Sequence, residues 1–324
     1  MSDEHQPKPH NAVATRLEYG RHIPHWPDMK LLRAKGQFHE LLNRWDMWMS
    51  AQHVYAVPTF SADRLSAELH LVVEMEPPVE EWSLILGDVV HNLVSSLDSL
   101  AWAICTLDGA TPASPNRVYF PADEKESVWK GRVKDLNTMP PEILERIRAI
   151  QPWTLPDPRR SVLHIIKALN NEDKHRQLVR LESSVRSVAS PKLTDGTWTD
   201  FLITPSTDDQ SLTTGKHLGT IVAAQPFPDD PHFDRLEISP RMKVVVSGLT
   251  WELSSLLHLA VELVRDCISW VQAGETRPPL LLNVELANVP GDPTRVITQN
   301  YYIDEQDRER AMNSPADANS SGTP

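Results

Sequence analysis

Apolar side chains recur at helical spacing in several segments of the chain. In the clearest of them, leucine and valine residues follow each other at intervals of three and four positions, which places them on one face of a helix. Gly109 would close one of these helices, and Thr250 is suited to cap the start of another. Helices are predicted for residues 28–50, 79–106, 124–136, 140–150, 160–171 and 250–272.

Two other regions alternate with the period of a β-strand. Residues 64–75 alternate apolar and polar side chains until Pro77 and Pro78 end the pattern. From residue 176 to 246, β-branched residues and repeated alternation indicate an antiparallel sheet of three to five strands. Helices and strands in separate runs are typical of an α+β fold, so we expect a helical bundle with an antiparallel sheet packed on it.

The chain divides into three regions by composition. The polar start of the chain has no apolar stretch after its charges, so it is interpreted as a flexible leader and not as a signal peptide. The end is rich in Pro, Asn, Asp and Ser, which is typical of a loose, largely disordered tail. The predicted regions are a leader at 1–27, a single domain at 28–274 (helical core 79–175, sheet 176–246, helix 250–272) and a tail at 275–324.

The charge of the chain restricts its partners. No apolar run approaches the length of about 18 residues that a membrane span needs, so we expect no membrane contact and a cytoplasmic protein. The formal net charge of −12 opposes diffuse binding to nucleic acid or to an anionic membrane. Residues 159–180 differ, because they hold six basic and two acidic side chains, a net charge of +4. RNA or a nucleotide, if bound, is expected at this segment.

The helix predicted at 79–106 carries an unusual polar face. From Gly87 through Trp102 there is no Lys, Glu or Gln, although these residues normally cover a solvent-exposed helix face. The alternatives are an ordinary solvent face or a face that packs on a second element. The polar residues of this face are Asp88, His91, Asn92, Ser95, Asp98 and Ser99.

A second polar face is predicted on the helix that begins near residue 160. It holds His164, Lys167, Asn171, Lys174 and His175. If the two faces meet, Asp88 and Asp98 would pair with these basic side chains, because an unpaired charge in a dry groove is costly. A structural ion network and a working site both satisfy this requirement, so the pattern leaves both open.

Cofactor and metal chemistry have little support in the sequence. Cys105 and Cys267 lie in apolar helical contexts and are expected to be buried free thiols. Two cysteines cannot form a zinc cluster, HExxH is absent, and Asp88 with His91 supplies only two ligands. No glycine-rich phosphate loop occurs. We therefore expect neither a metal nor a cofactor.

Four motifs occur in a fixed order: GDVVHNLVSSLDSLAW, YFP, QPW and LNNEDKHRQL. In this order they resemble a largely uncharacterised family of bacterial proteins with the pattern HNLRSALDHLAW, FPI, LQPY and NxDKHR. The resemblance covers residues 86–178. The Arg and His of the family helix are similar to the R-x4-6-H signature of HEPN-type helical domains, many of which are metal-independent RNases of defence or toxin–antitoxin systems. Here these two positions are Val94 and Ser99.

The resemblance implies three functions. The first is a non-catalytic or degenerate HEPN-like protein that binds a ligand or partner, in a defence setting and as a homodimer, since HEPN-type domains often dimerise. The second is a metal-independent RNase or phosphodiesterase, with His175 as acid and base, Asp98 orienting it, and Lys174 and Arg176 holding phosphate. The third is a purely structural role. The expected ligand-binding residues are His91, Asn92, Asn171, Lys174 and Arg176.

Overall fold

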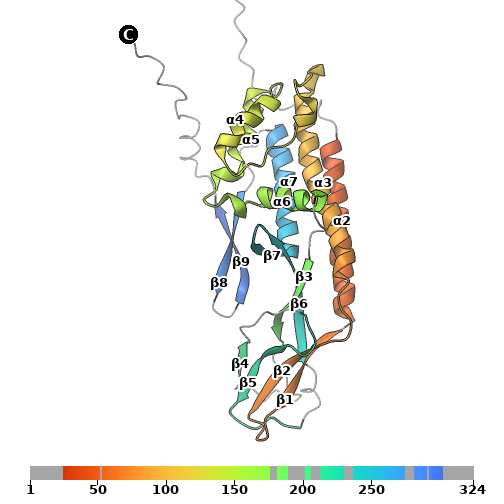
Figure 1. Ribbon diagram of the computed structural model, residues 1–324, viewed down its shortest axis with the longest axis vertical. Helices are drawn as coiled ribbons and strands as arrows, with labels where there is room; N and C mark the ends of the chain where they lie inside the picture. The colour runs from red at the N-terminus through yellow and green to blue at the C-terminus, as the bar shows by residue number, and fades with distance from the viewer. Residues whose placement is uncertain are drawn as a thin grey trace, which may run out of the picture.

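The computed structural model combines helices and antiparallel sheets, which confirms the α+β class. The helices gather at one end of an elongated molecule, and much of the main sheet extends past them to form the opposite end (Figure 1). The structure describes residues 25–51, 53–175, 181–188, 201–205, 212–229, 236–273, 281–289 and 292–301.

Each predicted helix is present in the structure. Two of them differ from the predicted bounds by more than two residues at one end, since α6 continues to His175 and α7 begins at Leu253. The helices are α2 (Trp26–Ser50), α3 (Val79–Cys105), α4 (Glu126–Asp135), α5 (Pro141–Ala149), α6 (Val162–His175) and α7 (Leu253–Ala273).

Thr250 does not cap the last helix, which corrects the sequence prediction. It lies in a short strand, β7 (Leu249–Glu252), that pairs with β6 (Leu236–Val246). The carboxylate of Glu252 instead accepts hydrogen bonds from the backbone N–H groups of Ser254 and Ser255, at 3.1 and 2.7 Å. These N–H groups belong to the first turn of α7, where they have no partner within the helix, so the helix begins after Glu252.

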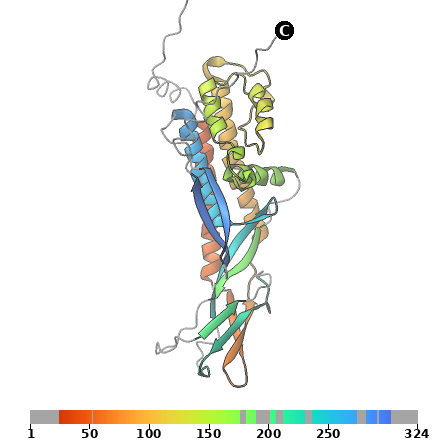
Figure 2. The same cartoon turned by 90° about the vertical axis from the view of Figure 1, so that its left-hand side faces the viewer.

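Helix α3 lies at the centre of the helical end. It contacts α2, α6 and α7, and it runs beside α2 over most of its length (Figures 1 and 2). Its apolar face is completely buried at Leu86, Leu93, Leu97 and Leu100. Burial of several leucines at helical spacing supplies much of the energy that fixes the bundle, about 2 kcal/mol for each side chain.

The main sheet has the strand order β3–β6–β1–β2–β5–β4, and β7 pairs with β6. Its helix contacts come mainly from β3, β6 and β7, while β1, β2, β4 and β5 lie beyond the helices (Figures 1 and 2). The expected packing of the sheet on the bundle therefore holds for one part of the sheet only. The strands besides β6 and β7 are β1 (Val54–Phe60), β2 (Ser66–Val73), β3 (Leu181–Val188), β4 (Phe201–Pro205) and β5 (His217–Ala223).

The sheet is not confined to residues 176–246, because β1 and β2 lie at its centre. Strand β2 agrees with the alternation predicted for residues 64–75, whereas β1 was not predicted. Strand β1 contains Pro58, which has no N–H to donate and pairs with Leu69 of β2. On its other side, within the described residues, Tyr55 and Ala56 of β1 pair with Glu237 and Leu236 of β6.

The end of the chain corrects a second prediction. Strands β8 (Leu281–Val289) and β9 (Asp292–Tyr301) form an antiparallel pair within the region predicted as a loose tail. Alternation of apolar residues such as Val284 and Leu286 was present there, but the polar composition outweighed it in the sequence interpretation. Residues 1–24 and 302–324 lie outside the described part of the chain. In the described part, every helix is too short or too polar to cross a membrane.

Candidate functional site

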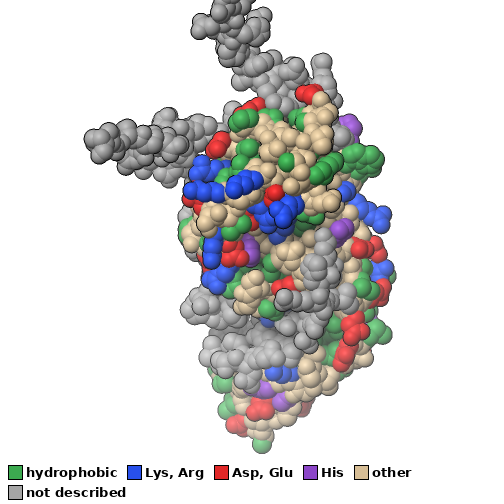
Figure 3. Space-filling view, turned by 45° about the horizontal axis from the view of Figure 1, so that its top comes forward, with side chains coloured by type: hydrophobic (Ala, Val, Ile, Leu, Met, Phe, Trp, Pro, Cys, Tyr) green, Lys and Arg blue, Asp and Glu red, His purple; other side chains and the backbone are tan. Residues whose placement is uncertain are grey.

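A pocket of about 760 Å³ lies at the helical end of the molecule. Its walls come from α3, α4, α6 and the extended segment 119–125, which begins with the YFP motif. Acidic and basic side chains are mixed on this end of the molecule (Figure 3). The charged and polar residues of the pocket wall include Asp98, Asp123, Glu124, Lys125, Arg132, His164, Lys167, Asn170 and Asn171.

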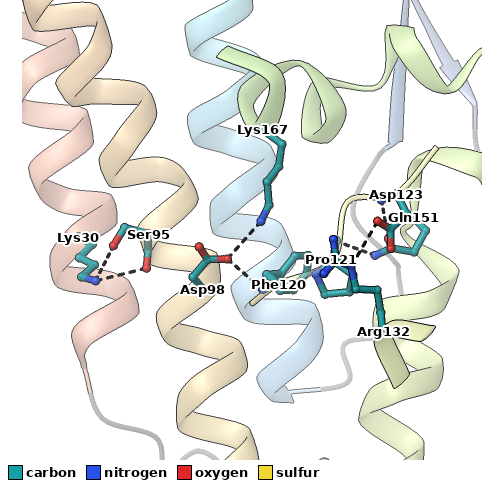
Figure 4. A network of polar contacts seen from close by, with 9 residues as sticks. All are labelled: Lys30, Ser95, Asp98, Phe120, Pro121, Asp123, Arg132, Gln151 and Lys167. Atoms are coloured by element: carbon teal, nitrogen blue, oxygen red, sulfur yellow. Dashed lines mark hydrogen bonds and ion pairs between the residues drawn. The ribbon is translucent and has the colours of Figure 1, made fainter. Parts of the chain in front are cut away.

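Asp98 joins three walls of this pocket. Its Oδ1 accepts a hydrogen bond from the backbone N–H of Phe120 at 2.9 Å and another from Nζ of Lys167 at 3.3 Å (Figure 4). The carboxylate on α3 therefore holds both the extended segment and α6. The sequence prediction that Asp98 meets Lys167 agrees with this geometry, and the contact has the character of a structural ion pair.

The remaining polar face of α3 packs on α2 and not on α6. Lys30 donates to Ser95 Oγ at 2.6 Å (Figure 4). It also donates to Ser99 Oγ at 2.8 Å. Gln37 donates to Asp88 Oδ2 at 3.1 Å, and Asn92 donates to Gln37 Oε1 at 2.9 Å. The face does meet a second element. Asp88 pairs with Gln37 of α2, and Lys167 pairs with Asp98, while the side chains of Lys174 and His175 lie outside the described part of the chain.

The predicted ligand-binding residues fall into three groups. His91 is exposed and Asn92 is half-buried against Gln37, so neither lines the pocket. Asn171 is exposed and does line it. The side chains of Lys174 and His175, in the last turn of α6, and the whole of Arg176 lie outside what the structure describes, so the acid–base and phosphate roles stay predictions.

The extended segment is held in place by a residue that the sequence interpretation assigned no role. Gln151, from the QPW motif, is completely buried. Its amide donates to the carbonyl of Pro121 at 3.0 Å, and its Oε1 accepts from the N–H of Asp123 at 3.3 Å (Figure 4). The amide also donates to the carbonyl of Ile147 at 3.1 Å. The sequence shows the order of the YFP and QPW motifs, but spacing alone does not show that one side chain connects them.

Three polar atoms of the pocket-lining residues have no hydrogen-bond partner. They are Asp123 Oδ2, His164 Nε2 and Asn170 Oδ1. Five buried side-chain atoms are unpaired in the described part of the chain, so more than half of them belong to this pocket. A buried polar atom without a partner costs roughly 1 to 3 kcal/mol. The pocket wall is therefore polar where a purely structural wall would be apolar or fully paired.

The surroundings of His164 determine which of its ring nitrogens can accept a hydrogen bond. Its Nδ1 lies 3.5 Å from Oε1 of Glu124, so the proton of the neutral ring is placed on Nδ1. Burial lowers the pKa of His164 below its ordinary value, and the nearby Glu124 and Asp157 carboxylates only partly offset this effect. The ring is therefore neutral near pH 7, and Nε2 is a hydrogen-bond acceptor.

Two of the three cations of the pocket wall are paired with carboxylates, and the third, Lys125, is exposed. Lys167 binds Asp98, and Nε of Arg132 lies 3.6 Å from Oδ1 of Asp123. The wall has three acidic side chains and three basic ones, so its net charge is zero when His164 is neutral. The pocket therefore does not provide the positive field that a phosphate-binding site needs.

Neither of the two cysteines lines this pocket. Cys105 and Cys267 are buried free thiols, as predicted, and burial raises the pKa of both. Neither thiol is therefore suited to nucleophilic chemistry. Within the described ranges, no three His, Cys, Asp or Glu side chains are grouped so that they could hold a metal ion.

Comparison with known proteins identifies no relative: no family model, no curated protein and no solved structure matches this chain.

Proposed function

We propose that this protein is a non-catalytic binding protein whose small polar ligand occupies the pocket between α3, α6 and the segment 119–125. The observation that carries the proposal is the set of three unpaired atoms on Asp123, His164 and Asn170. Natural proteins rarely keep such atoms in a wall that has only a structural role, because each one lowers the stability of the fold. A ligand that pairs with them explains why they are retained.

The two positions of the R-x4-H signature support a non-catalytic role. Val94 is buried and lines the pocket, while Ser99 accepts its hydrogen bond from Lys30 on the side of α2. Residues five positions apart are about 140° apart around a helix axis. Val94 and Ser99 thus face different neighbours, and neither supplies a charge or an imidazole. We accordingly regard the bundle as a degenerate HEPN-like one, on the resemblance given above.

The described basic side chains favour a small ligand over RNA. Arg159 and Arg160 both lie within 3.4 Å of the Asp157 carboxylate, and Lys167 lies 3.3 Å from Asp98. Binding of an RNA backbone depends on basic groups that are available to phosphates. The carboxylates beside these three residues offset much of the positive charge that the sequence places between residues 159 and 180.

A blocking substitution tests the proposal. Asn171→Trp introduces a large side chain at the pocket wall, whereas Glu172→Trp places the same side chain at the neighbouring exposed position of α6, which does not line the pocket. Thermal-shift measurements would use adenosine, adenosine 5′-monophosphate, arginine and agmatine. We expect at least one compound to raise the Tm of the wild type and of Glu172→Trp, but not that of Asn171→Trp.

Two results would contradict the proposal. One is that every compound that raises the Tm of the wild type does the same for Asn171→Trp, which would place binding outside the pocket. The other is cleavage of an RNA oligonucleotide by the wild type and its loss in His175→Ala, which would establish the enzyme hypothesis instead.

A further inference from the structure

The chemistry of the three unpaired atoms restricts the ligand further. The carboxylate oxygen of Asp123 and the amide oxygen of Asn170 are hydrogen-bond acceptors. The Nε2 atom of His164 is also an acceptor, because the Nδ1 proton faces Glu124. All three atoms therefore require a hydrogen-bond donor from the ligand, and none of them can bind a phosphate oxygen.

The burial of these residues shows that the acceptors belong to a formed wall. Asn170 is 3% exposed, and the side chains of His164 and Asp123 are 13% and 11% exposed. The unpaired atoms themselves are shielded from solvent. A donor reaches Asp123 and Asn170 when the terminal group of the side chain turns toward the pocket, because this last torsion is soft in Asp and Asn. At His164 the ring and the exposed Glu124 side chain turn together, so that Nδ1 keeps its partner.

The charged neighbours favour a cation over an anion. Arg132 and Lys167 each lie beside a carboxylate of the same wall, so their charge is largely compensated. On Asp123, Arg132 lies near Oδ1 and leaves Oδ2 without a partner. An incoming ammonium or guanidinium group would supply both the missing hydrogen bond and a favourable charge at Asp123, whereas a phosphate would be repelled by that carboxylate.

We infer that the ligand of this pocket is a small organic cation with several N–H donors, a guanidinium or ammonium compound, which binds through Asp123 Oδ2, His164 Nε2 and Asn170 Oδ1. This inference rests on the proposed function, because it specifies the ligand class of the same pocket. It also replaces the RNA or nucleotide that the basic segment predicted with a ligand of the opposite charge.

Isothermal titration calorimetry of the full chain at neutral pH tests the inference. The probes are agmatine, which carries a guanidinium and an ammonium group, and adenosine 5′-monophosphate as the anion. We expect saturable binding of agmatine and none of the nucleotide. Asp123→Asn replaces a charged acceptor by a neutral amide. It should weaken the affinity for agmatine at least about tenfold, or about 1.4 kcal/mol.

The matched control is Asp135→Asn. Asp135 lies on α4, its Oδ1 is 3.9 Å from Arg117, its side chain is 18% exposed, and it does not line the pocket. It therefore resembles Asp123 in burial and in pairing with an arginine. Agmatine should bind to Asp135→Asn as it does to the wild type. Asn170→Leu is the second test variant and should also lose binding, so a folding defect in one variant does not decide the result.

The outcomes separate the ligand class from the pocket. Binding of the nucleotide but not of agmatine, with loss of that binding in Asn171→Trp, contradicts the assignment of a cationic ligand. The proposed function would still hold. Binding of Mg²⁺ or Zn²⁺ at the pocket without agmatine also overturns it. Agmatine binding that is equal in wild type, Asp123→Asn and Asn170→Leu overturns the assignment of these acceptors. Absence of saturable binding for every probe overturns the inference and removes support from the proposed function.

Discussion

Helix α3 has polar groups on two sides, and the two sides differ in how those groups are paired. Toward α2, Lys30 donates hydrogen bonds to Ser95 and Ser99. Gln37 donates to Asp88 and accepts from Asn92. Toward α6, the Asp98 pair is made, but the adjoining wall contains acceptors without partners. In this segment the first side is a saturated interface that joins two helices, while the unpaired Nε1 of Trp48 lies farther along α2, against Trp82.

The comparison shows that polar side chains between helices do not by themselves indicate a binding site. Their state of hydrogen bonding does, because a paired group contributes to architecture and an unpaired one lowers stability until a ligand arrives. The saturated α2–α3 interface and the unsaturated pocket wall are therefore expected to respond differently to substitution.

The largest effect is expected for Gln151→Leu, which removes the support of the pocket wall. The substitution leaves the partly buried N–H of Asp123 and the buried carbonyls of Pro121 and Ile147 without this partner. We expect a loss of about 3 kcal/mol in the free energy of unfolding, measured by urea denaturation. Gln37→Leu at the α2–α3 interface is the matched control and should cost about 1 kcal/mol. Equal losses would show that the wall segment does not depend on Gln151.

An effect of opposite sign is expected for Asn170→Leu. Leucine is similar in size to asparagine and has no acceptor to leave unpaired. We expect the free energy of unfolding to rise by about 1.5 kcal/mol while agmatine binding is lost, which is the trade-off expected at a functional position. A loss of stability would mean that Asn170 contributes to the fold, and it would contradict the description of the wall as unsaturated.

A smaller effect is expected at the saturated interface. Lys30→Met keeps the aliphatic part of the side chain but removes the ammonium that binds Ser95 and Ser99. Because this group is only partly buried, we expect a loss of about 1 kcal/mol in urea denaturation. Agmatine binding, measured by calorimetry, should be unchanged. A weaker affinity would show that the two sides of α3 are coupled.

The helices and the polar face of α3 could be predicted from the sequence, because spacing shows which residues share one face of a helix. Spacing does not show which element covers that face. The pairing of Lys30 with Ser99 spans 69 positions, and that of Gln151 with Asp123 spans 28. Such contacts depend on how the helices assemble. The Asp98–Lys167 pair was predicted because both residues stood out within their own helices.

Other features were missed for local reasons. Strand β1 contains Pro58, which weakens any strand prediction, and its place between β6 and β2 becomes clear only in the assembled sheet. Asp123 lies in an extended segment without periodicity, so no pattern singled it out. Asn170 was overlooked because it neighbours Asn171, which lies on the polar face of the same helix.

The smallest effect is expected from the pH dependence of stability. Burial lowers the pKa of His164 in the folded protein below its ordinary value of 6.5, against the opposing influence of Glu124 and Asp157 and with a further lowering by Arg159. The unfolded chain therefore takes up a proton more readily than the folded one as the solution becomes acidic. The stability that depends on the neutral ring is fully present above about pH 6.5 and declines as the pH falls toward the lowered value.

His164→Gln removes this titration and should flatten that part of the pH profile. The measurement is the free energy of unfolding in urea from about pH 7.5 to about pH 5, at constant ionic strength. His91→Gln is the control, because it replaces an exposed histidine on α3 outside the pocket. If His164→Gln follows the wild-type profile, the imidazole is not held neutral in the pocket wall, and Nε2 is not the acceptor that the proposed cation requires.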